Sequence, residues 1–364
     1  LQVGGGIEAR DLSFHYPART PVAVTLTLTD KLNLHYTEYG DRRLAAQAWP
    51  RNPLVNWFLS KAKPYQGGVY ISEAIEDGYT PTGGAIVEGS TLTRSQQNYS
   101  YPAQYRIKVL QEGVYLDRFR LLEVDTKGPM GPIVMLAEAA QRSTINKIRE
   151  NLALQLCAQT TSGNNVSSLF DVVKTTGSLG GVDPTQFPYW ASSGDYNVGA
   201  WSSNGVSKTR TMLRETRRYT GFSGPDAMFA SKTTIDAMKA GGYTKTTFFR
   251  DPNKAVGYDV GDGPKFTADA PDCEFDNIPV WYDPHLDALE AAGVDASHPG
   301  GVLVGINSEA VYFRINGTPF ALDTENGGPW KADPTKWGIY ADAFFKGNLV
   351  AKNRNSCFVL GGIT

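Results

Sequence analysis

The longest segment that a single secondary structure explains runs from residue 132 to about residue 160. Apolar side chains recur along it at helical spacing, and most of its charged side chains lie off that stripe. Pro132 suits the first turn of a helix, and the polar, glycine-containing residues 160–165 end it. At about 1.5 Å per residue this helix is roughly 40 Å long, longer than most helices of globular domains. We therefore predict a spine helix that crosses the whole fold and needs a wide surface to lie on.

The composition predicts a folded chain with one large or two modest cores, because 41% of its 364 residues are hydrophobic and 20% are charged. A formal net charge of -2 excludes a uniformly basic nucleic-acid coat and leaves room for a local basic face. Residues 1–63 carry more Lys and Arg than Asp and Glu, whereas residues 251–295 are strongly acidic. This asymmetry fits either a side that faces a polyanion or ordinary surface variation.

The cysteines and the hydropathy pattern limit the cellular environments that the sequence fits. Cys157, Cys273 and Cys357 are few, odd in number and far apart, without metal-ligand spacing, which predicts a reducing environment. No apolar run reaches membrane-spanning length, and we expect no signal peptide.

The first part of the chain indicates extended structure rather than a separate core. Residues 1–47 lack helical periodicity and are interpreted as an extended arm, followed by a short amphipathic helix over 52–61. Residues 66–110 contain strand-like runs, the first over 69–75, and predict a long polar hairpin. Because it has too few large apolar residues to stabilise itself, either another chain covers it or it is disordered. A further strand or strand–helix piece is expected over 114–124.

The second part of the chain predicts a mixed domain of helices and short strands. An ordered loop pinned by aromatic rings is expected over 177–204, and Ser231 is expected to cap a helix. The Asn316-Gly317 pair predicts the turn of a hairpin between 311–315 and 318–322. The remaining expected elements are helices over 207–219 and 231–240 and strands over 227–230, 278–282, 302–306, 338–345, 348–352 and 356–360.

Motifs that carry catalysis or bind metals are missing from the sequence. The four histidines, His15, His35, His285 and His298, stand in no metal-binding motif and are interpreted as surface or capping residues. The acidic cluster at Asp269, Asp272, Glu274 and Asp276 lacks calcium-loop spacing and is interpreted as a solvated loop. No nucleophile elbow or phosphate-binding loop is present. We therefore expect no catalytic, cofactor-binding or metal site, and favour a structural or interaction protein.

A basic helix is expected over 207–218, which contains five cationic side chains and one carboxylate, that of Glu215. These side chains spread around more than one face and have little aromatic interleaving, so specific reading of bases is not supported. Non-specific phosphate contacts and salt bridges between subunits remain, and we favour the bridges slightly.

The order of the expected elements along the chain resembles that of a known protein family more clearly than any single motif does. An extended arm, a short helix, a long polar hairpin, a spine helix, a glycine-rich loop, a mixed domain and closing strands follow one another. This order resembles the major capsid proteins of tailed double-stranded DNA phages, which have the α+β Hong Kong 97-type fold. Three short stretches are also similar: 176–184 after the spine helix, 277–280 before a strand, and the closing 347–356.

In that family an N-terminal arm and a hairpin called the E-loop lie over neighbouring subunits. A peripheral P-domain holds the spine helix, and an axial A-domain surrounds the centre of each capsomer. The resemblance implies an N-terminal arm over 1–47, a short helix joining the P-domain over 48–65, the E-loop over 66–110, the P-domain with the spine helix over 111–162, the A-domain over 163–325 and C-terminal P-domain strands over 326–364.

The function implied by the resemblance is that of a major capsid protein. Pentamers and hexamers of the chain would assemble in the host cytoplasm into the icosahedral head of a tailed phage. Its partners would be further copies of itself, packaged double-stranded DNA, and portal, scaffolding and cement proteins, with no membrane. No scaffolding segment precedes the arm, so either Leu1 is a cleaved end or scaffolding is a separate protein. The basic residues expected to face a neighbouring subunit or DNA are Arg10, Arg19, Arg42, Arg43, Arg94, Arg214, Arg217 and Arg218.

Two other classes of protein stay open. One is an encapsulin-like compartment that encloses cargo protein, although encapsulin chains are generally shorter. The other is a β-rich carbohydrate-active enzyme, which would need an aromatic-lined groove with a pair of carboxylates.

One branch of the capsid family joins subunits by an isopeptide bond between a Lys of the E-loop and an Asn of the P-domain, promoted by a Glu. Candidate asparagines are present at Asn353 and Asn355, but no lysine lies between Lys63 and Lys108. The resemblance therefore implies a shell held by non-covalent contacts.

Overall fold

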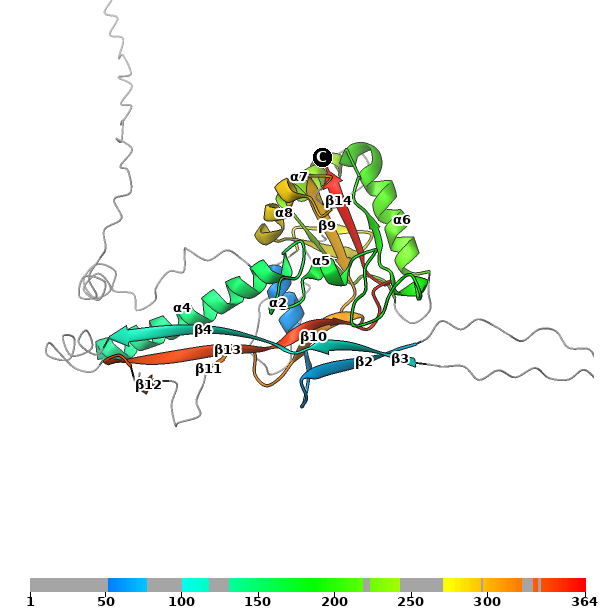
Figure 1. Ribbon diagram of the computed structural model, residues 1–364. Coiled ribbons are helices and arrows are strands. Elements are labelled where there is room, and N and C mark those ends of the chain that lie inside the picture. The colour runs from blue at the N-terminus through cyan, green and yellow to red at the C-terminus, as the bar shows by residue number, and fades with distance from the viewer. Residues whose placement is uncertain are drawn as a thin grey trace, which may run out of the picture.

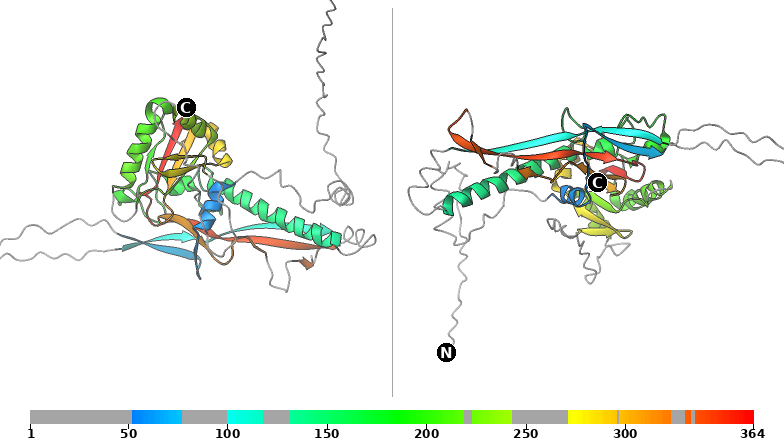
Figure 2. Two further views of the ribbon diagram at one scale, coloured as in Figure 1. Left: turned by 180° about the vertical axis from the view of Figure 1, so that it is seen from behind. Right: turned by 90° about the horizontal axis from the view of Figure 1, so that it is seen from below.

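The computed structural model describes residues 52–76, 100–117, 131–218, 223–242, 271–295, 297–322, 330–332 and 335–364. The expected arm over 1–47 and the middle of the expected hairpin lie outside these ranges. The described residues form two parts, seen from three sides in Figures 1 and 2. One is a long, thin layer of strands under helix α4, and the other is a thicker body of sheet and short helices at one end of that layer.

Helix α4 (Gly131–Leu156) is the predicted spine helix. Ile148, Leu152 and Leu156 are fully buried at every fourth position, so the C-terminal half of the apolar stripe in the sequence is a packed face. The helix ends where the hydroxyl of Ser168 donates a hydrogen bond to the carbonyl oxygen of Leu156 at 3.3 Å. Within the described part of the chain, no helix is both long and apolar enough to span a membrane.

Strand β13 (Gly338–Ala351) is the centre of the thin layer. β4 (Lys108–Asp117) pairs with one edge of it, antiparallel over ten positions of register. The other edge pairs with β12 (Lys331–Ala332), β11 (Ala321–Leu322) and β10 (Val311–Ile315), and β1 (Lys63–Pro64) lies parallel to β10.

The expectation of two separate strands over 338–345 and 348–352 is wrong. The chain continues as one strand through Gly347, because Gly347 pairs with Lys108 on one edge and with Ile315 on the other. A residue held by both neighbours has no freedom to turn.

The hairpin expected at Asn316-Gly317 is also wrong. β10 and β11 do not pair with each other, because both run antiparallel to β13, one after the other along the same edge. Gly317 has the positive φ of 78° that a turn favours, yet the N–H of Asn316 donates to the carbonyl oxygen of Lys346 at 2.8 Å. The Asn-Gly pair therefore makes an irregular step between two strands that share one long partner.

The second sheet lies in the thicker body and has the strand order β5-β14-β9-β6-β8-β7. β6 (Ala227–Ala230) and β8 (Ile278–Tyr282) occupy the residues that the sequence predicted. β14, from the closing segment of the chain, belongs to this sheet. The other strands are β5 (Ser193–Asp195), β7 (Cys273–Phe275), β9 (Gly301–Ile306) and β14 (Phe358–Ile363).

Short helices surround the second sheet (Figure 1). α6 (Val206–Thr216), α7 (Lys232–Gly242) and the π-helical η2 (Trp201–Gly205) share one hydrophobic cluster with one of its faces. η3 (Pro284–Leu286) and α8 (Asp287–Ala292) follow β8, and Leu286 and Leu289 join the larger cluster on the other side.

Helix α7 begins where the sequence predicted, but Ser231 does not cap it as expected. The hydroxyl of Ser231 instead accepts a hydrogen bond from a backbone N–H of β9 at 3.0 Å. The N–H groups of Lys232 and Thr233 donate to Asp287 and Glu290 of α8, at 2.8 and 2.9 Å. Carboxylates are favourable at a helix N-terminus, so α8 supplies the cap that the sequence assigned to a neighbour in the chain.

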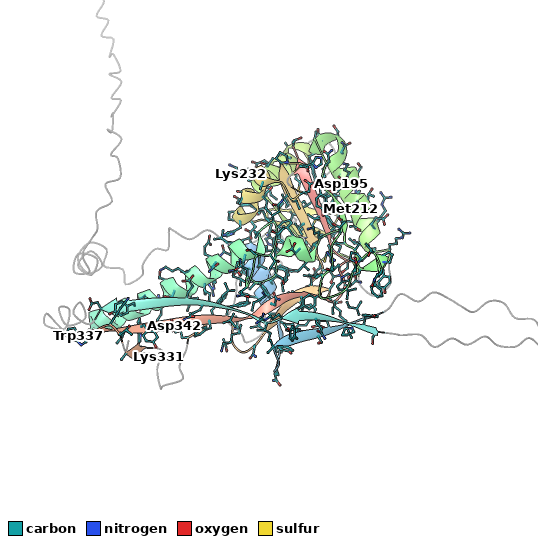
Figure 3. All side chains as sticks on the ribbon, in the orientation of Figure 1. Asp195, Met212, Lys232, Lys331, Trp337 and Asp342 are labelled. Atoms are coloured by element: carbon teal, nitrogen blue, oxygen red, sulfur yellow. The ribbon has the colours of Figure 1, made fainter. Side chains whose placement is uncertain are left out.

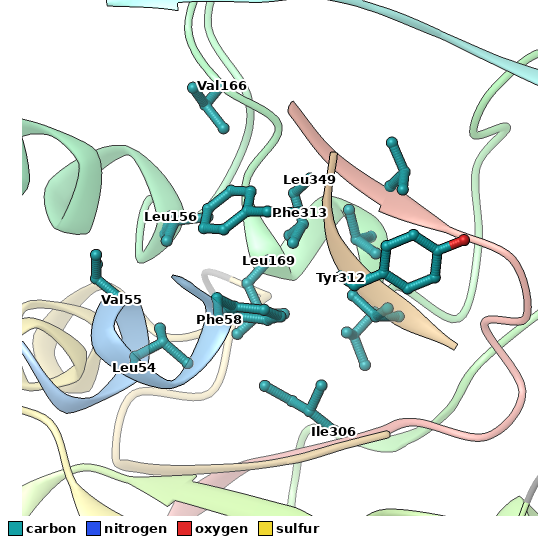
Figure 4. Packing of buried hydrophobic residues seen from close by; sticks show 14 of the residues in the cluster. Leu54, Val55, Phe58, Leu156, Val166, Leu169, Ile306, Tyr312, Phe313 and Leu349 are labelled. Atoms are coloured by element: carbon teal, nitrogen blue, oxygen red, sulfur yellow. The ribbon is translucent and has the colours of Figure 1, made fainter. Parts of the chain in front are cut away.

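The short helix α2 (Pro53–Ser60) lies where the thin layer meets the thicker body. Trp57 packs edge-on against Phe229 of the second sheet, with ring centroids 5.6 Å apart. Phe58 packs against Phe313 of the first sheet at 5.4 Å, and Figure 4 shows this pair within the core. The predicted helix thus joins the two sheets through adjacent aromatic side chains.

The glycine-rich loop over 177–204 is ordered and held by rings, as predicted. Trp190 is 1% exposed and Trp201 is 2% exposed. Trp201 lies edge-on to Phe275 of β7, with ring centroids 6.3 Å apart. These contacts attach the loop, which contains η1 (Pro188–Trp190), to the second sheet.

Candidate inter-subunit surfaces

A two-stranded hairpin projects from the end of the thin layer opposite α4 (Figure 1). β2 (Tyr70–Glu76) pairs antiparallel with β3 (Ser100–Arg106), with Glu76 opposite Ser100 at the outer end. β3 leads almost directly into β4, so the hairpin continues the long sheet. The 69–75 strand of the expected hairpin is confirmed as β2, and residues 77–99 lie outside the described ranges.

The base of the hairpin is fixed to the rest of the chain. Glu73 is 6% exposed, and its Oε1 lies 2.6 Å from Nε of Arg314 in β10. The buried hydroxyl of Tyr105 donates to the carbonyl oxygen of Ala351 at 2.9 Å, and its burial raises the pKa of this phenol. The N–H of Gln104 donates to the carbonyl oxygen of Gly180 at 2.9 Å. The chain itself therefore orients this part of the hairpin.

Apolar side chains are exposed at the same place. Val69 is 60% exposed, Tyr70 57% and Tyr101 43%, although each lies on or beside an ordered strand. Buried positions alternate with exposed ones along both strands, as expected for a ribbon packed on one face only. Tyr70 points to the exposed face of the ribbon, whereas Tyr101 pairs with Ile75 on the packed face, with its ring 5.1 Å from that of Phe187. Exposed apolar side chains on an ordered ribbon mark a candidate contact surface for another chain.

The β4–β13 ribbon carries a second such surface. Leu110, Ala343 and Phe345 are buried on the face beneath α4. On the opposite face Tyr340 pairs with Tyr115, which is 41% exposed. Further along that face Phe344 pairs with Gln111 and Lys346 with Val109. Val109 is 55% exposed, so this face also presents apolar groups.

The far end of the ribbon is also exposed. Trp337 is 50% exposed, just before β13 begins. Figure 3 shows Trp337 and Lys331 at this end and Asp342 further along the ribbon, far from Asp195, Lys232 and Met212 in the thicker body. The exposed apolar side chains thus follow the length of the thin layer.

The basic helix is α6, and the structure divides its cations into two groups. Lys208 lies 2.8 Å from Oδ2 of Asp195, and Arg210 makes two 3.1 Å hydrogen bonds to the carboxylate of Asp276. The hydrogen bond and charge of Asp276 raise the pKa of Arg210. Lys208 and Arg210 therefore pair with carboxylates of their own chain.

The remaining cations, on α6 and just after it, are exposed. Nε of Arg214 donates to a carbonyl oxygen of its own helix at 3.2 Å, and Arg218 lies 3.6 Å from Glu215. Arg217 is exposed at the C-terminal end of the helix. Arg214, Arg217 and Arg218 therefore lie close together, whereas Arg10, Arg19, Arg42, Arg43 and Arg94 lie outside the described residues.

The interpretation of His285 as a surface or capping residue is wrong. Its side chain is 4% exposed and lies between two carboxylates. His298 is 39% exposed and pairs with Asp295, which agrees with the surface interpretation. Asp272 and Asp276 accept hydrogen bonds from Tyr282 and Arg210, and the described residues contain no group suited to a metal ion.

Arg354 is a key residue that sequence reasoning missed. It is fully buried, and its guanidinium donates to four backbone carbonyl oxygens. Its burial lowers the pKa of this guanidinium. These carbonyls belong to Asp171, Val172, Lys174 and Gly177, around the end of α5 (Leu169–Val172). Nothing in the polar run over 353–356 indicates burial, so no sequence signal was available.

Solved structures resemble this chain. No family model matches it, and neither does any curated protein. The cyanophage A-1(L) capsid asymmetric unit is 13% identical, with a TM-score of 0.61, and the match covers 90% of this chain and 97% of that one. The mature capsid of bacteriophage PhiM1 is 11% identical, with a TM-score of 0.51 and coverage of 90% and 91%.

An encapsulin has a similar structure too. The holo-SrpI encapsulin complex from Synechococcus elongatus PCC 7942 is 10% identical, with a TM-score of 0.53, and the match covers 93% of this chain and 96% of that one. The chain therefore has the α+β fold of Hong Kong 97-type capsid proteins, as the resemblance in the sequence predicted.

Proposed function

We propose that the chain is the major capsid protein of a tailed phage and assembles into an icosahedral shell that encloses double-stranded DNA. The observation that carries the proposal is the match to the cyanophage capsid over 90% of this chain. The exposed apolar side chains of the hairpin and of the β4–β13 ribbon support it, because a shell would cover them with neighbouring copies. The role is structural, and we propose no catalysis for it.

The domain division implied by the resemblance is part of this proposal. The arm over 1–47 and the E-loop over 66–110 would contact neighbours, and α4 with β4 and β13 would form the P-domain. The second sheet would belong to the A-domain, and its strand order supports placing β14 there rather than in the P-domain. Portal, scaffolding and cement proteins, and assembly in the host cytoplasm, are proposed on the same basis.

A protein compartment of the encapsulin type is the second candidate. The encapsulin neighbour supports it, because its chain is matched over 96% of its length by 93% of this one. The two chains are therefore similar in length, and the expectation that length separates the classes does not apply to this encapsulin. Residues 1–63, with eight Lys and Arg against five Asp and Glu, favour the DNA-containing shell, since phosphate contacts need cations.

One experiment separates the candidates. Particles isolated from their natural source are treated with nuclease, washed, and then opened. A capsid yields protected double-stranded DNA, whereas a compartment yields a specific cargo protein. Size-exclusion chromatography and negative-stain microscopy of the purified chain provide the first test, since a protein that never forms closed shells contradicts both proposals.

A further inference from the structure

His285 connects three parts of the chain that are distant in the sequence. Its Nδ1 lies 2.9 Å from Oδ1 of Asp283, at the start of η3 in the thicker body. Its Nε2 lies 3.0 Å from Oε1 of Glu150 in α4. The other oxygen of Asp283, Oδ2, accepts the N–H of Leu54 in the first turn of α2, at 3.1 Å. One imidazole thus links the spine helix to the body and, through Asp283, to α2.

Few other charged groups face this site from the packed elements. α2 contains no charged residue, and it contributes a backbone N–H. Directly after α4 lies the buried thiol of Cys157, whose burial raises its pKa, so it stays protonated and uncharged. The carboxylates of α8, Asp287 and Glu290, are occupied by the N-terminus of α7. The charge of the site is therefore set by His285, Asp283 and Glu150.

The geometry requires two N–H donors on one imidazole ring. A neutral imidazole has one N–H, so it can donate to Asp283 or to Glu150 but not to both. With both carboxylates ionised, only the imidazolium makes both hydrogen bonds. Asp283 Oδ1 also accepts the backbone N–H of His285 at 2.9 Å. This hydrogen bond holds the carboxylate at the start of η3 in either protonation state of the imidazole ring.

The side chain of Glu150 is 22% exposed, and His285 is the one hydrogen-bond donor to its carboxylate among the described residues. Its Oε2 is buried and makes no hydrogen bond with any described residue. If His285 loses a proton and keeps the N–H on Nδ1, the lone pair of Nε2 faces Oε1 of Glu150. Oε1 then loses its donor while Oε2 stays buried without one, so the neutral ring no longer holds this carboxylate in place.

We propose that His285 and Glu150 form a proton-dependent latch between α4 and the thicker body. The latch is closed while His285 carries two ring protons, and it opens when one of them leaves. Opening lets the part of α4 around Glu150 move relative to the second sheet. The inference concerns a single chain, so it holds whether or not the chain forms the shell proposed above.

The direction of the pH dependence follows from the surroundings of the ring. Burial by itself lowers the pKa of His285, but the hydrogen bonds and charges of Asp283 and Glu150 outweigh it and raise this pKa above its ordinary value of about 6.5. A raised pKa in the folded state stabilises the latch fully below about pH 6.5. That contribution is lost as the pH rises through the folded-state pKa of His285.

Hydrogen exchange of the full-length protein, followed by mass spectrometry, tests the latch. We expect the protection factors of α4 peptides over 145–156, corrected for intrinsic exchange, to fall about tenfold between about pH 6 and pH 9, as suits the loss of a charge-assisted hydrogen bond. In Glu150→Gln the side-chain amide can donate to the neutral ring. The same peptides should then change by less than about twofold over that range.

Two histidine variants complete the test. His298 also bonds a carboxylate, but its side chain is 39% exposed and its partner Asp295 is only three residues away, so His298→Gln should keep the wild-type pH dependence. His285→Gln should lose it, and if that variant does not fold, Glu150→Gln decides alone. Constant protection of α4 in the wild type, or an unchanged fall in folded His285→Gln or in Glu150→Gln, would overturn the proposal.

Discussion

Glu73 and Arg314 are 241 residues apart in the sequence, yet Oε1 of one lies 2.6 Å from Nε of the other. The side chain of Glu73 is 7% exposed and that of Arg314 is 25% exposed. The hydrogen bond and charge of Glu73 raise the pKa of Arg314. The same guanidinium donates to the carbonyl oxygen of Pro64 at 3.2 Å. This pair therefore fixes the base of the β2–β3 hairpin to the first sheet.

Replacing Arg314 by Met should destabilise the protein by about 2 kcal/mol, because it leaves the carboxylate of Glu73 buried without its partner. Urea unfolding of the full chain measures this loss. The Glu73→Leu/Arg314→Met double variant should recover most of it, since apolar side chains of similar volume often replace a buried pair at little cost.

A matched control is the more exposed bridge between Lys208 and Asp195, whose side chains are each 30% exposed. Lys208→Met should cost about 0.5 kcal/mol. Equal losses for Lys208→Met and Arg314→Met would show that burial does not distinguish the two pairs.

Arg354 provides a second test of a buried charge. Lysine carries the same charge, but three donors on one nitrogen cannot replace a planar fork that reaches four carbonyl oxygens. We expect Arg354→Lys to cost at least about 3 kcal/mol in the free energy of unfolding. Arg217→Lys, on the exposed end of α6, should stay within about 0.5 kcal/mol. An Arg354→Lys protein that unfolds at the wild-type urea concentration would contradict the role given to these hydrogen bonds.

The sequence was sufficient for elements whose own periodicity is strong. α4 was predictable because its apolar stripe continues over many turns, and β6 and β8 because each is a short apolar strand with clear bounds. The prediction of a hairpin turn at Asn316-Gly317 was wrong because β10 and β11 both pair with one long strand, and this pairing outweighs the local turn preference. Local propensity does not report such a partner.

The candidate surfaces were predictable only in part. Ile71, Glu73 and Ile75 alternate on one face of the first strand of the hairpin, so a charge on a buried face was visible in the sequence. The partner of Glu73 was not visible, since pairing across 241 residues depends on the whole topology. The same holds for His285 and Glu150, which are 135 residues apart.

A third prediction concerns the part of the proposed E-loop beyond β2 and β3. Glu76 and Ser100 lie directly opposite each other, so a two-residue Asn-Gly turn can replace residues 77–99 without changing the register. The shortened chain should keep its circular dichroism spectrum and unfolding transition, because Glu73 and Tyr105 still anchor the base. It should form no closed shells by negative-stain microscopy, and normal shells would contradict the contact role proposed for this segment.

The arginines give a fourth prediction, with two sets of variants. Changing Arg214, Arg217 and Arg218 to Gln should lower the yield of particles without changing the DNA in each, as expected for bridges between subunits. Changing Arg10, Arg19, Arg42 and Arg43 to Gln should weaken DNA retention as salt rises, as expected for phosphate contacts.

Arg210→Gln is the control for both sets. Because Arg210 is already paired with Asp276, this variant should leave the particle yield and the DNA content near wild type. The measurements are particle yield and nuclease-protected DNA per particle over a range of salt concentrations. Unchanged values for either set would remove the role proposed for that set.

The last prediction is that the shell contains no covalent bonds between subunits. An isopeptide bond needs an amine that can lose its proton, and no lysine lies between Lys63 and Lys108. Arg94 cannot replace it, because a guanidinium stays protonated. The two flanking lysines are engaged elsewhere: Nζ of Lys63 lies 3.6 Å from the centre of the Tyr312 ring, and Nζ of Lys108 donates to a carbonyl oxygen at 3.1 Å.

Boiling purified particles in SDS with a reducing agent should therefore return one band at 39.6 kDa. A ladder of larger bands would contradict the prediction and direct attention to Lys63, since its burial and the nearby Arg314 lower its pKa and so favour the reactive amine. In that case Lys63→Arg, which keeps the charge but cannot attack a side-chain amide, should abolish the ladder, whereas Lys108→Arg should leave it unchanged.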